Sequence, residues 1–266
     1  MTHVYNDTFF DYIDGGARRS ANVLVGMLSE WLSPDSVLDL GCGRGVWLDE
    51  WHKAGAHDIL GVDGDYVNPD NLSIPANSFL AGDLTKPIEL PRRFSLAQSL
   101  EVGEHLPTCA SDALVDSLTS AADRVLFSSA GVGLGGEFHI NEQPLSFWQK
   151  KFAERGYRAY DCLRPKLAGI NAVEPWYRYN SILYVNDAGA TGLPDQVTQT
   201  AIENGQDVTS AGDWKWRMRR NVVRHLPRKA VTRIAQMRSV VIAAQARKLG
   251  SCGELTPMTH VDHIQG

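Results

Sequence analysis

Hydrophobic positions along this chain follow two patterns that alternate. Short apolar runs typical of buried strands occupy residues 36–40, 59–63, 78–84, 94–101, 124–129, 157–163 and 179–185. Between several of them, apolar residues recur at helical spacing, over residues 46–54, 110–122 and 144–155. Strands that alternate with helices predict an α/β fold, with a parallel sheet covered by helices on both faces. Ligands of such sheets bind at the carboxyl ends of the strands.

The segments outside this region divide the chain further. Residues 1–35 predict a helical cap, with helical spacing over 18–32 after an aromatic stretch that either covers the active site or completes the core. Residues 36–185 form the main domain. Residues 186–212 are rich in Gly, Asp, Thr and Gln and predict a linker or a loosely packed segment. Residues 213–250 are helical by pattern, with a break at Pro227, and 251–266 predict a tail. The aromatic stretch contains Tyr5, Phe9, Phe10 and Tyr12.

A glycine-rich turn follows the first predicted strand. Gly41, Gly43 and Gly45 stand at alternate positions just before a predicted helix, and such glycines let a ligand approach the backbone amides. The spacing differs from the Gly-x-Gly-x-x-Gly of dinucleotide binders. With Asp39 ahead of it, the turn resembles the first motif of class I S-adenosylmethionine (SAM) dependent methyltransferases. That resemblance implies a Rossmann-like, seven-stranded, mostly parallel sheet, with SAM as the cofactor.

Acidic residues end the next two predicted strands. Asp63 lies about twenty residues beyond the turn, where nucleoside-binding folds place the acceptor for ribose hydroxyls, and Asp65 competes for that role. By the same resemblance, Asp83 accepts a hydrogen bond from the adenine amino group and Leu84 packs on the ring. Ser99, near the end of the fourth strand, completes the predicted cofactor-binding set.

Two carboxylates and an imidazole follow the fourth strand within five residues. Glu101, Glu104 and His105, together with His139 from a loop made supple by glycines, offer mixed oxygen and nitrogen ligands suited to a divalent cation. The set resembles the metal site of the small-RNA 3′-end 2′-O-methyltransferases. Its Glu-x-x-Glu-His part also resembles the ubiquinone-pathway O-methyltransferases. In the RNA family the metal binds adjacent substrate hydroxyls, which implies the same role here, with Mg²⁺ or Mn²⁺ favoured over Zn²⁺.

Readings without a metal stay open for the same residues. Glu104, His105 and His139 are the predicted catalytic residues, but Glu104 could cap the next helix and His105 could be a buried, satisfied histidine. His139 could act as a general base without a metal. Other side chains could contact or orient the acceptor, or serve only loop hydrogen bonding, helix capping or core packing. They are Asn141, Glu142 and Trp148, in that order of alternatives, and Trp176, Tyr177 and Arg178, which could instead anchor an expected loop over 168–178.

Charge is distributed unevenly along the chain. The net charge is −5, yet residues 213–250 hold eleven Lys and Arg against one acid, which leaves 15 basic and 30 acidic residues elsewhere. A basic helix with interleaved aromatic residues suits an anionic membrane surface or a nucleic acid backbone. Packing on its own domain or on a second subunit is an equal alternative. The sequence leaves the oligomeric state open.

The sequence also bounds the setting of the protein. No run of eighteen apolar residues occurs, and the start of the chain does not have the pattern of a signal peptide, so we expect a cytoplasmic protein, with a peripheral position at the membrane as an alternative. The four cysteines lack the paired spacing of a zinc knuckle or a disulfide framework.

The patterns together predict a SAM-dependent O-methyltransferase. Its acceptor would be a hydroxyl of a polyhydroxylated small molecule or glycan, activated with the help of a divalent metal. An RNA 2′-O-methyltransferase is the enzymatic alternative. A nucleotide-binding or scaffolding module without chemistry is the alternative from another class. The sequence does not identify the acceptor.

Overall fold

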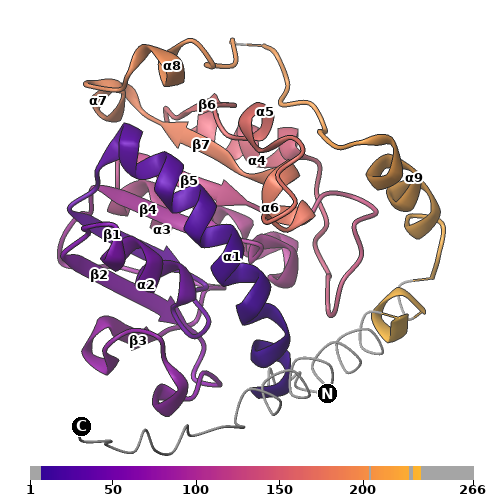
Figure 1. The fold of residues 1–266 in the computed structure, drawn as a ribbon, viewed down its shortest axis with the longest axis horizontal. Helices are drawn as coiled ribbons and strands as arrows, with labels where there is room; N and C mark the ends of the chain where they lie inside the picture. The colour runs from indigo at the N-terminus through magenta and orange to yellow at the C-terminus, as the bar shows by residue number, and fades with distance from the viewer. Residues whose placement is uncertain (1–6, 204, 228–229, 235–266) are drawn as a thin grey trace, which may run out of the picture.

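A seven-stranded sheet runs through the centre of the computed structural model, which describes residues 7–203, 205–227 and 230–234 (Figure 1). The strand order is β3-β2-β1-β4-β5-β7-β6, and β7 is the strand that runs antiparallel to both of its neighbours. The strands are β1 (Ser36–Leu40), β2 (Asp58–Asp63), β3 (Phe79–Ala81), β4 (Leu96–Leu100), β5 (Arg124–Ser128), β6 (Arg158–Tyr160) and β7 (Ile182–Val185). The predicted Rossmann-like, mostly parallel sheet is therefore confirmed.

Helices cover both faces of the sheet because the strands bury apolar side chains on each side. On one face, Val37 joins a core with α1 (Asp7–Leu32) and α2 (Val46–Lys53), extended by α5 (Arg164–Leu167) and α6 (Pro175–Asn180). On the other face, Leu38 and Leu40 pack in a core with α3 (Ser111–Ala121) and α4 (Leu145–Ala153). Consecutive β1 residues serve opposite cores, as expected for a strand buried on both faces.

Two element boundaries differ from the sequence prediction. Helix α1 begins at Asp7, eleven residues before the expected start, and Figure 1 shows it crossing the face of the sheet. The seventh strand begins at Ile182 instead of residue 179. Pro175 occupies the first turn of α6, a position where its missing amide hydrogen costs nothing, and the helix runs on to Asn180. The expected loop over 168–178 is therefore partly helical.

The stretch after β7 packs more closely than a linker. Residues 186–212 contain α7 (Asp187–Ala190) and α8 (Asp195–Thr198), and Leu193, Val197 and Val208 are buried. Ala201 also forms a β-bridge with Tyr160.

The basic region begins with α9 (Trp214–Val223), capped at its start by Asp213. Pro227 follows this helix, and residues 230–234 are helical again. The expected tail over 251–266 and Tyr5 lie outside the described residues. Among the described helices, none has the length and apolar character needed to cross a membrane. Cys42, Cys109 and Cys162 are free thiols.

Candidate active site

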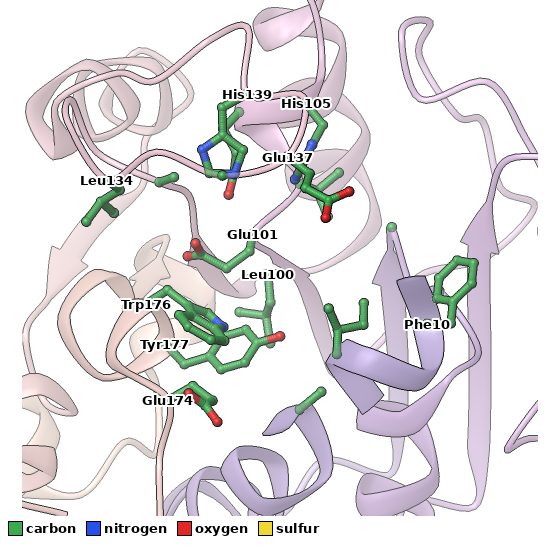
Figure 2. A pocket seen from close by; sticks show the side chains of 18 of the residues that line it. Phe10, Leu100, Glu101, His105, Leu134, Glu137, His139, Glu174, Trp176 and Tyr177 are labelled. Carbon is green, nitrogen blue, oxygen red and sulfur yellow. The ribbon is translucent and has the colours of Figure 1, made fainter. Parts of the chain in front are cut away.

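A cavity of about 1380 Å³ opens at the carboxyl ends of β1, β2 and β4 (Figure 2). Pockets for one small ligand usually measure about 300–1,000 Å³, so this cavity has room for two ligands side by side. Its walls come from α1, the glycine turn, the ends of β2, β3 and β4, the loop before α4, helix α6 and the basic helix α9. We divide it into a donor half at the glycine turn and an acceptor half beyond β4.

The glycine turn forms the floor of the donor half. Gly41, Gly43 and Gly45 have φ values of +88°, +53° and +78°, in the left-handed region that favours glycine. A Cβ on Gly41 would clash with the side chain of Val102, and one on Gly45 would lie 2.8 Å from Ile74. Both the conformation and the space therefore require glycine, and the backbone of the turn, without side chains at these positions, lines the cavity.

Asp63 fixes this turn from the end of β2. Its Oδ2 accepts a hydrogen bond from the Gly43 amide at 2.6 Å, and its Oδ1 accepts bonds from the Gly64 amide at 2.7 Å and the Tyr66 hydroxyl at 2.5 Å. Asp63 is buried, and burial raises its pKa. Asp65, the predicted competitor, is an exposed residue at the cavity wall. Tyr66 belongs to the site as well, although no pattern in the sequence marks it.

Asp39 lies deeper in the donor half, at the end of β1. It is buried and accepts a hydrogen bond of 2.9 Å from Gln98 Nε2. Burial raises the pKa of Asp39 to about 7, against the effect of the Gln98 bond. Trp51 donates in turn to the Gln98 side chain at 2.8 Å, so Asp39 ends a buried polar chain.

Two of the other predicted cofactor residues line the cavity and one does not. Asp83 is exposed at the end of β3, where the hydroxyl of Thr85 and the ammonium of Lys86 hold its pKa low, at about 2. Leu84 beside it is buried and also lines the cavity. Ser99 is fully buried and donates to the Leu40 carbonyl at 2.7 Å. Its side chain joins β4 to β1 and is not part of the cavity wall, which corrects its predicted role.

Glu104 is the most deeply buried acid of the acceptor half. Its Oε2 accepts a hydrogen bond of 2.9 Å from the Ser129 hydroxyl, while Oε1 has no hydrogen-bond partner among the described residues. An unpaired buried carboxylate oxygen is costly, so its presence indicates a ligand that supplies positive charge or a hydrogen bond. The Glu104 carbonyl also accepts the amides of Ile140 and Asn141, which ties the loop before α4 to this turn.

His105 and His139 complete a compact group with Glu104. Their rings lie 4.9 Å apart edge to face, and one ligand atom from each of the three residues falls within 4.8 Å of the others (Figure 2). Burial lowers the pKa of His105 to about 4, so this imidazole is neutral at pH 7, as a metal ligand must be. One carboxylate and two imidazoles with an unpaired oxygen fit a divalent cation.

Glu101 departs from the predicted ligand set. It lines the cavity near this group but is not one of the three residues whose ligand atoms converge. Its backbone has φ +57°, unusual for a residue with a side chain, and its carboxylate accepts a long hydrogen bond of 3.4 Å from Asn180. In the described structure the candidate metal site therefore has three protein ligands and not four.

Glu142 holds His139 in place. Its Oε1 lies 2.9 Å from His139 Nδ1, and the same carboxylate accepts the amides of Gly133 and Gly135 at 2.8 and 2.6 Å. The prediction that Glu142 orients the acceptor is corrected, because its side chain points to the histidine and the loop. A carboxylate on one ring nitrogen fixes the tautomer and leaves the other nitrogen for a ligand.

Two other predicted acceptor contacts serve the framework. Asn141 is buried and bonds to the Gly103 carbonyl and the Ser111 hydroxyl. Trp148 is fully buried against Phe127 in the core. Neither residue lines the cavity, so both correspond to the structural alternatives given above.

Aromatic and basic side chains close the outer wall. Trp176 and Tyr177 of α6 line the cavity, which agrees with the alternative in which they contact the acceptor, and Figure 2 shows them below Glu101. Arg178 also lines it, with its guanidinium donating to the Val173 carbonyl at 2.7 Å. From α1, Phe10 is buried at the cavity wall, so this residue of the aromatic stretch covers the site, whereas the side chains of Phe9 and Tyr12 lie outside the described part of the structure. The sequence did not place α9 here, yet Lys215, Trp216 and Arg219 line the same cavity.

A family model described as a methyltransferase domain matches residues 18–158, more than half of the chain. The chain belongs to this methyltransferase family. The ribosomal protein L11 methyltransferase of Methylobacillus flagellatus is 34% identical over 77 residues. That match covers 26% of this chain and 26% of the relative, so the chain spans about a quarter of the length of the curated relative it matches.

Solved structures share the fold of this methyltransferase at low sequence identity. DesVI of Streptomyces venezuelae superposes with a TM-score of 0.52 at 16% identity, over 69% of this chain and 97% of that chain. The sugar N-methyltransferase KedS8 of a Streptoalloteichus species gives 0.50 at 14%, over 70% and 97%. A putative O-methyltransferase of Nostoc punctiforme gives 0.51 at 13%, over 67% and 59%. Family and fold together make the chain a class I SAM-dependent methyltransferase.

Proposed function

We propose that this methyltransferase transfers the methyl group of SAM to a hydroxyl of a polyhydroxylated small molecule or glycan, with a divalent cation bound at Glu104, His105 and His139. The observation that carries the proposal is the buried Glu104 carboxylate, which has an unpaired Oε1 and converges with the imidazoles of His105 and His139 to within 4.8 Å. A nitrogen acceptor needs no such group, because an amine is already nucleophilic when neutral. A hydroxyl is a poor nucleophile at neutral pH and needs activation.

Each half of the cavity has a distinct task in this proposal. The glycine turn and Asp63 bind the nucleoside part of SAM, and Asp83 and Leu84 lie where the adenine would reach. Glu104, His105 and His139 would hold Mg²⁺ or Mn²⁺, which when bound lowers the pKa of a hydroxyl and orients it. Glu142 keeps the His139 ring fixed, and the aromatic side chains of α6 provide a flat apolar wall against a ring of the acceptor.

The test combines cofactor, metal and product. We expect the purified protein to bind SAM in calorimetry and to methylate members of a panel of sugars and glycosides with vicinal hydroxyls, with the new methyl group on oxygen by mass spectrometry and NMR. His139→Ala and EDTA should each abolish turnover but leave SAM binding intact, and Glu154→Gln at an exposed site is the control. Turnover that survives both treatments would exclude the metal, and a methyl group on nitrogen would exclude the acceptor class.

An RNA 2′-hydroxyl is the second candidate acceptor. It is favoured by one observation, that Lys215, Trp216 and Arg219 of the basic helix α9 line the same cavity. Cations and an aromatic ring suit a phosphate backbone with stacked bases. Methylation of a short RNA, with binding that weakens steeply as salt rises and weakens further in Lys215→Ala/Arg219→Ala, would support it. Absence of RNA binding at low salt would remove it.

A further inference from the structure

Helix α9 has an inner face that fixes it to the methyltransferase domain. The Trp216 ring lies 5.5 Å from the Tyr179 ring, and the Arg220 guanidinium donates to the Val132 carbonyl at 3.0 Å. Val223 packs against Gly135, in the loop that carries His139. These contacts place α9 beside that loop, as Figure 1 shows, with one side of the helix on the domain.

The opposite face of α9 presents a stripe of large apolar side chains to solvent. Trp214, Met218 and Val222 are 67%, 55% and 58% exposed, and they stand four residues apart, which places them on one side of a helix. Exposed apolar residues scattered singly are ordinary, but a continuous stripe marks a surface that binds something. None of the three lines the cavity, so the active site does not explain them.

Basic side chains border this stripe on both sides. At about 100° per residue, Lys215 and Arg219 fall on one flank of the stripe and Arg217 falls on the other, while Arg224 follows it on the side toward Gly133. The helix itself contains no acidic residue. An apolar centre with cationic borders is the arrangement of helices that lie in the interface of an anionic bilayer, with the apolar side chains among the acyl chains and the cations at the headgroups.

We propose that α9 docks this methyltransferase on an anionic lipid surface through Trp214, Met218 and Val222. The position of the apolar residues decides against nucleic acid as the occupant, because a phosphate backbone needs cations at the centre of the surface and gains nothing from Met218 or Val222. Because the apolar residues lie on one side of α9 only, the helix binds the membrane from its surface and does not span it. It lies along the surface while its inner face stays on the domain.

Docking in this orientation has a consequence for the acceptor. Trp216 and Arg219 line the cavity from the same helix, so an α9 held at the headgroups brings the acceptor half of the cavity to the lipid surface. An acceptor carried on a lipid anchor would then reach the site without leaving the membrane. This step rests on the proposed function, whereas the docking itself does not.

The test is flotation of the full-length protein with vesicles in the absence of SAM and acceptor, so its outcome is independent of the proposed function. We expect the protein to float with phosphatidylcholine vesicles containing about a third phosphatidylglycerol and to stay unbound with phosphatidylcholine alone. Trp214→Ala/Met218→Ala/Val222→Ala should lower the partition coefficient at least about tenfold. Arg217→Glu/Arg224→Glu should lower the fraction that floats with the anionic vesicles toward the level seen with phosphatidylcholine alone.

Matched controls separate docking from folding. Leu80→Ala removes an exposed apolar side chain on β3, and Arg158→Glu reverses an exposed charge on β6, so both should float like the wild type. All variants should bind SAM with unchanged affinity, which reports an intact domain. Failure of the wild type to float at low salt overturns the proposal, as does full binding by the triple alanine variant. Two other results would assign the face to a different partner, provided that the wild type never binds vesicles. Single-stranded RNA binding that is lost in these variants would assign it to RNA, and self-association in light scattering that is lost in them would assign it to a second copy of the chain.

Discussion

His139 and Glu142 form a pair in which the carboxylate Oε1 lies 2.9 Å from the imidazole Nδ1. The same carboxylate accepts two backbone amides of the glycine loop, so it fixes both the ring and the loop that carries it. The position of one candidate ligand therefore depends on a residue outside the cavity.

We predict that Glu142→Gln weakens binding of Mn²⁺ by about 10–100-fold. The glutamine amide group can donate to Nδ1, which favours the tautomer with its hydrogen on Nε2 and removes the lone pair that a metal needs. Binding of Mn²⁺ alone, followed by electron paramagnetic resonance, measures the change. His139→Ala gives the reference for a lost ligand, and Glu154→Gln should match the wild type. Equal Mn²⁺ affinity in Glu142→Gln and wild type would contradict the role of Glu142.

Asp63→Asn should lower the affinity for SAM by about 10–100-fold, the range expected when a charged hydrogen-bond acceptor becomes neutral. The carboxylate of Asp63 accepts hydrogen bonds from the Gly43 and Gly64 amides and the Tyr66 hydroxyl. An asparagine would turn an NH₂ group toward some of these donors and lose those bonds. Titration calorimetry with SAM measures the loss. Asp65→Asn, two residues away on the exposed wall, is the matched control. A larger effect at Asp65 than at Asp63 would reverse the assignment.

Asp39 should make stability fall as pH rises from about 4 to 7. Burial raises the pKa of Asp39 in the folded state to about 7, against 3.8 for an ordinary aspartate, so the folded state favours the neutral carboxyl. The stabilisation from Asp39 is fully present below the pKa of the unfolded state and is lost as the pH rises through the pKa of the folded state. The loss in the free energy of unfolding is at most about 4 kcal/mol. Asp39→Asn removes this titration. Urea unfolding at pH 5 and pH 8 should show the variant gaining stability relative to wild type at the higher pH, while Asp207→Asn does not. Parallel pH curves for Asp39→Asn and wild type would refute a raised pKa.

Gly41→Ala should destabilise the protein by about 2 kcal/mol or more and abolish SAM binding. A side chain at φ +88° is strained, and the added Cβ clashes with Val102. Gly26→Ala is the matched control, because a Cβ there meets nothing within 4 Å in an exposed turn of α1. That control should raise stability by about 0.5–1 kcal/mol. Thermal unfolding with and without SAM compares the two, and a Gly41→Ala protein as stable as wild type would show that the turn tolerates a side chain.

The sequence predicted those parts of the molecule that depend on local pattern. The glycine turn, Asp63 and the order of strands and helices follow from chain periodicity and from residue types at strand ends. Side-chain direction does not follow from such patterns. Ser99 and Trp148 stand next to site residues in the sequence but point into the framework, and Tyr66 points to Asp63 with no signal in its neighbours.

Contacts between segments far apart in the chain could not be predicted from the sequence either. Helix α9 follows β7 by almost thirty residues, yet it lines the cavity and packs beside the loop that holds His139. Charge composition indicated that the helix binds something. Only the folded chain shows which of its faces is already occupied.

Glu101 combines a strained backbone with a place in the cavity wall. At φ +57° the backbone conformation costs a residue with a side chain about 1 kcal/mol more than it costs glycine. A glycine at this position would leave the acceptor half without a carboxylate at the end of β4. A strained backbone under a carboxylate of the cavity wall is typical of functional positions, and we therefore expect Glu101→Gly to raise stability while it lowers activity.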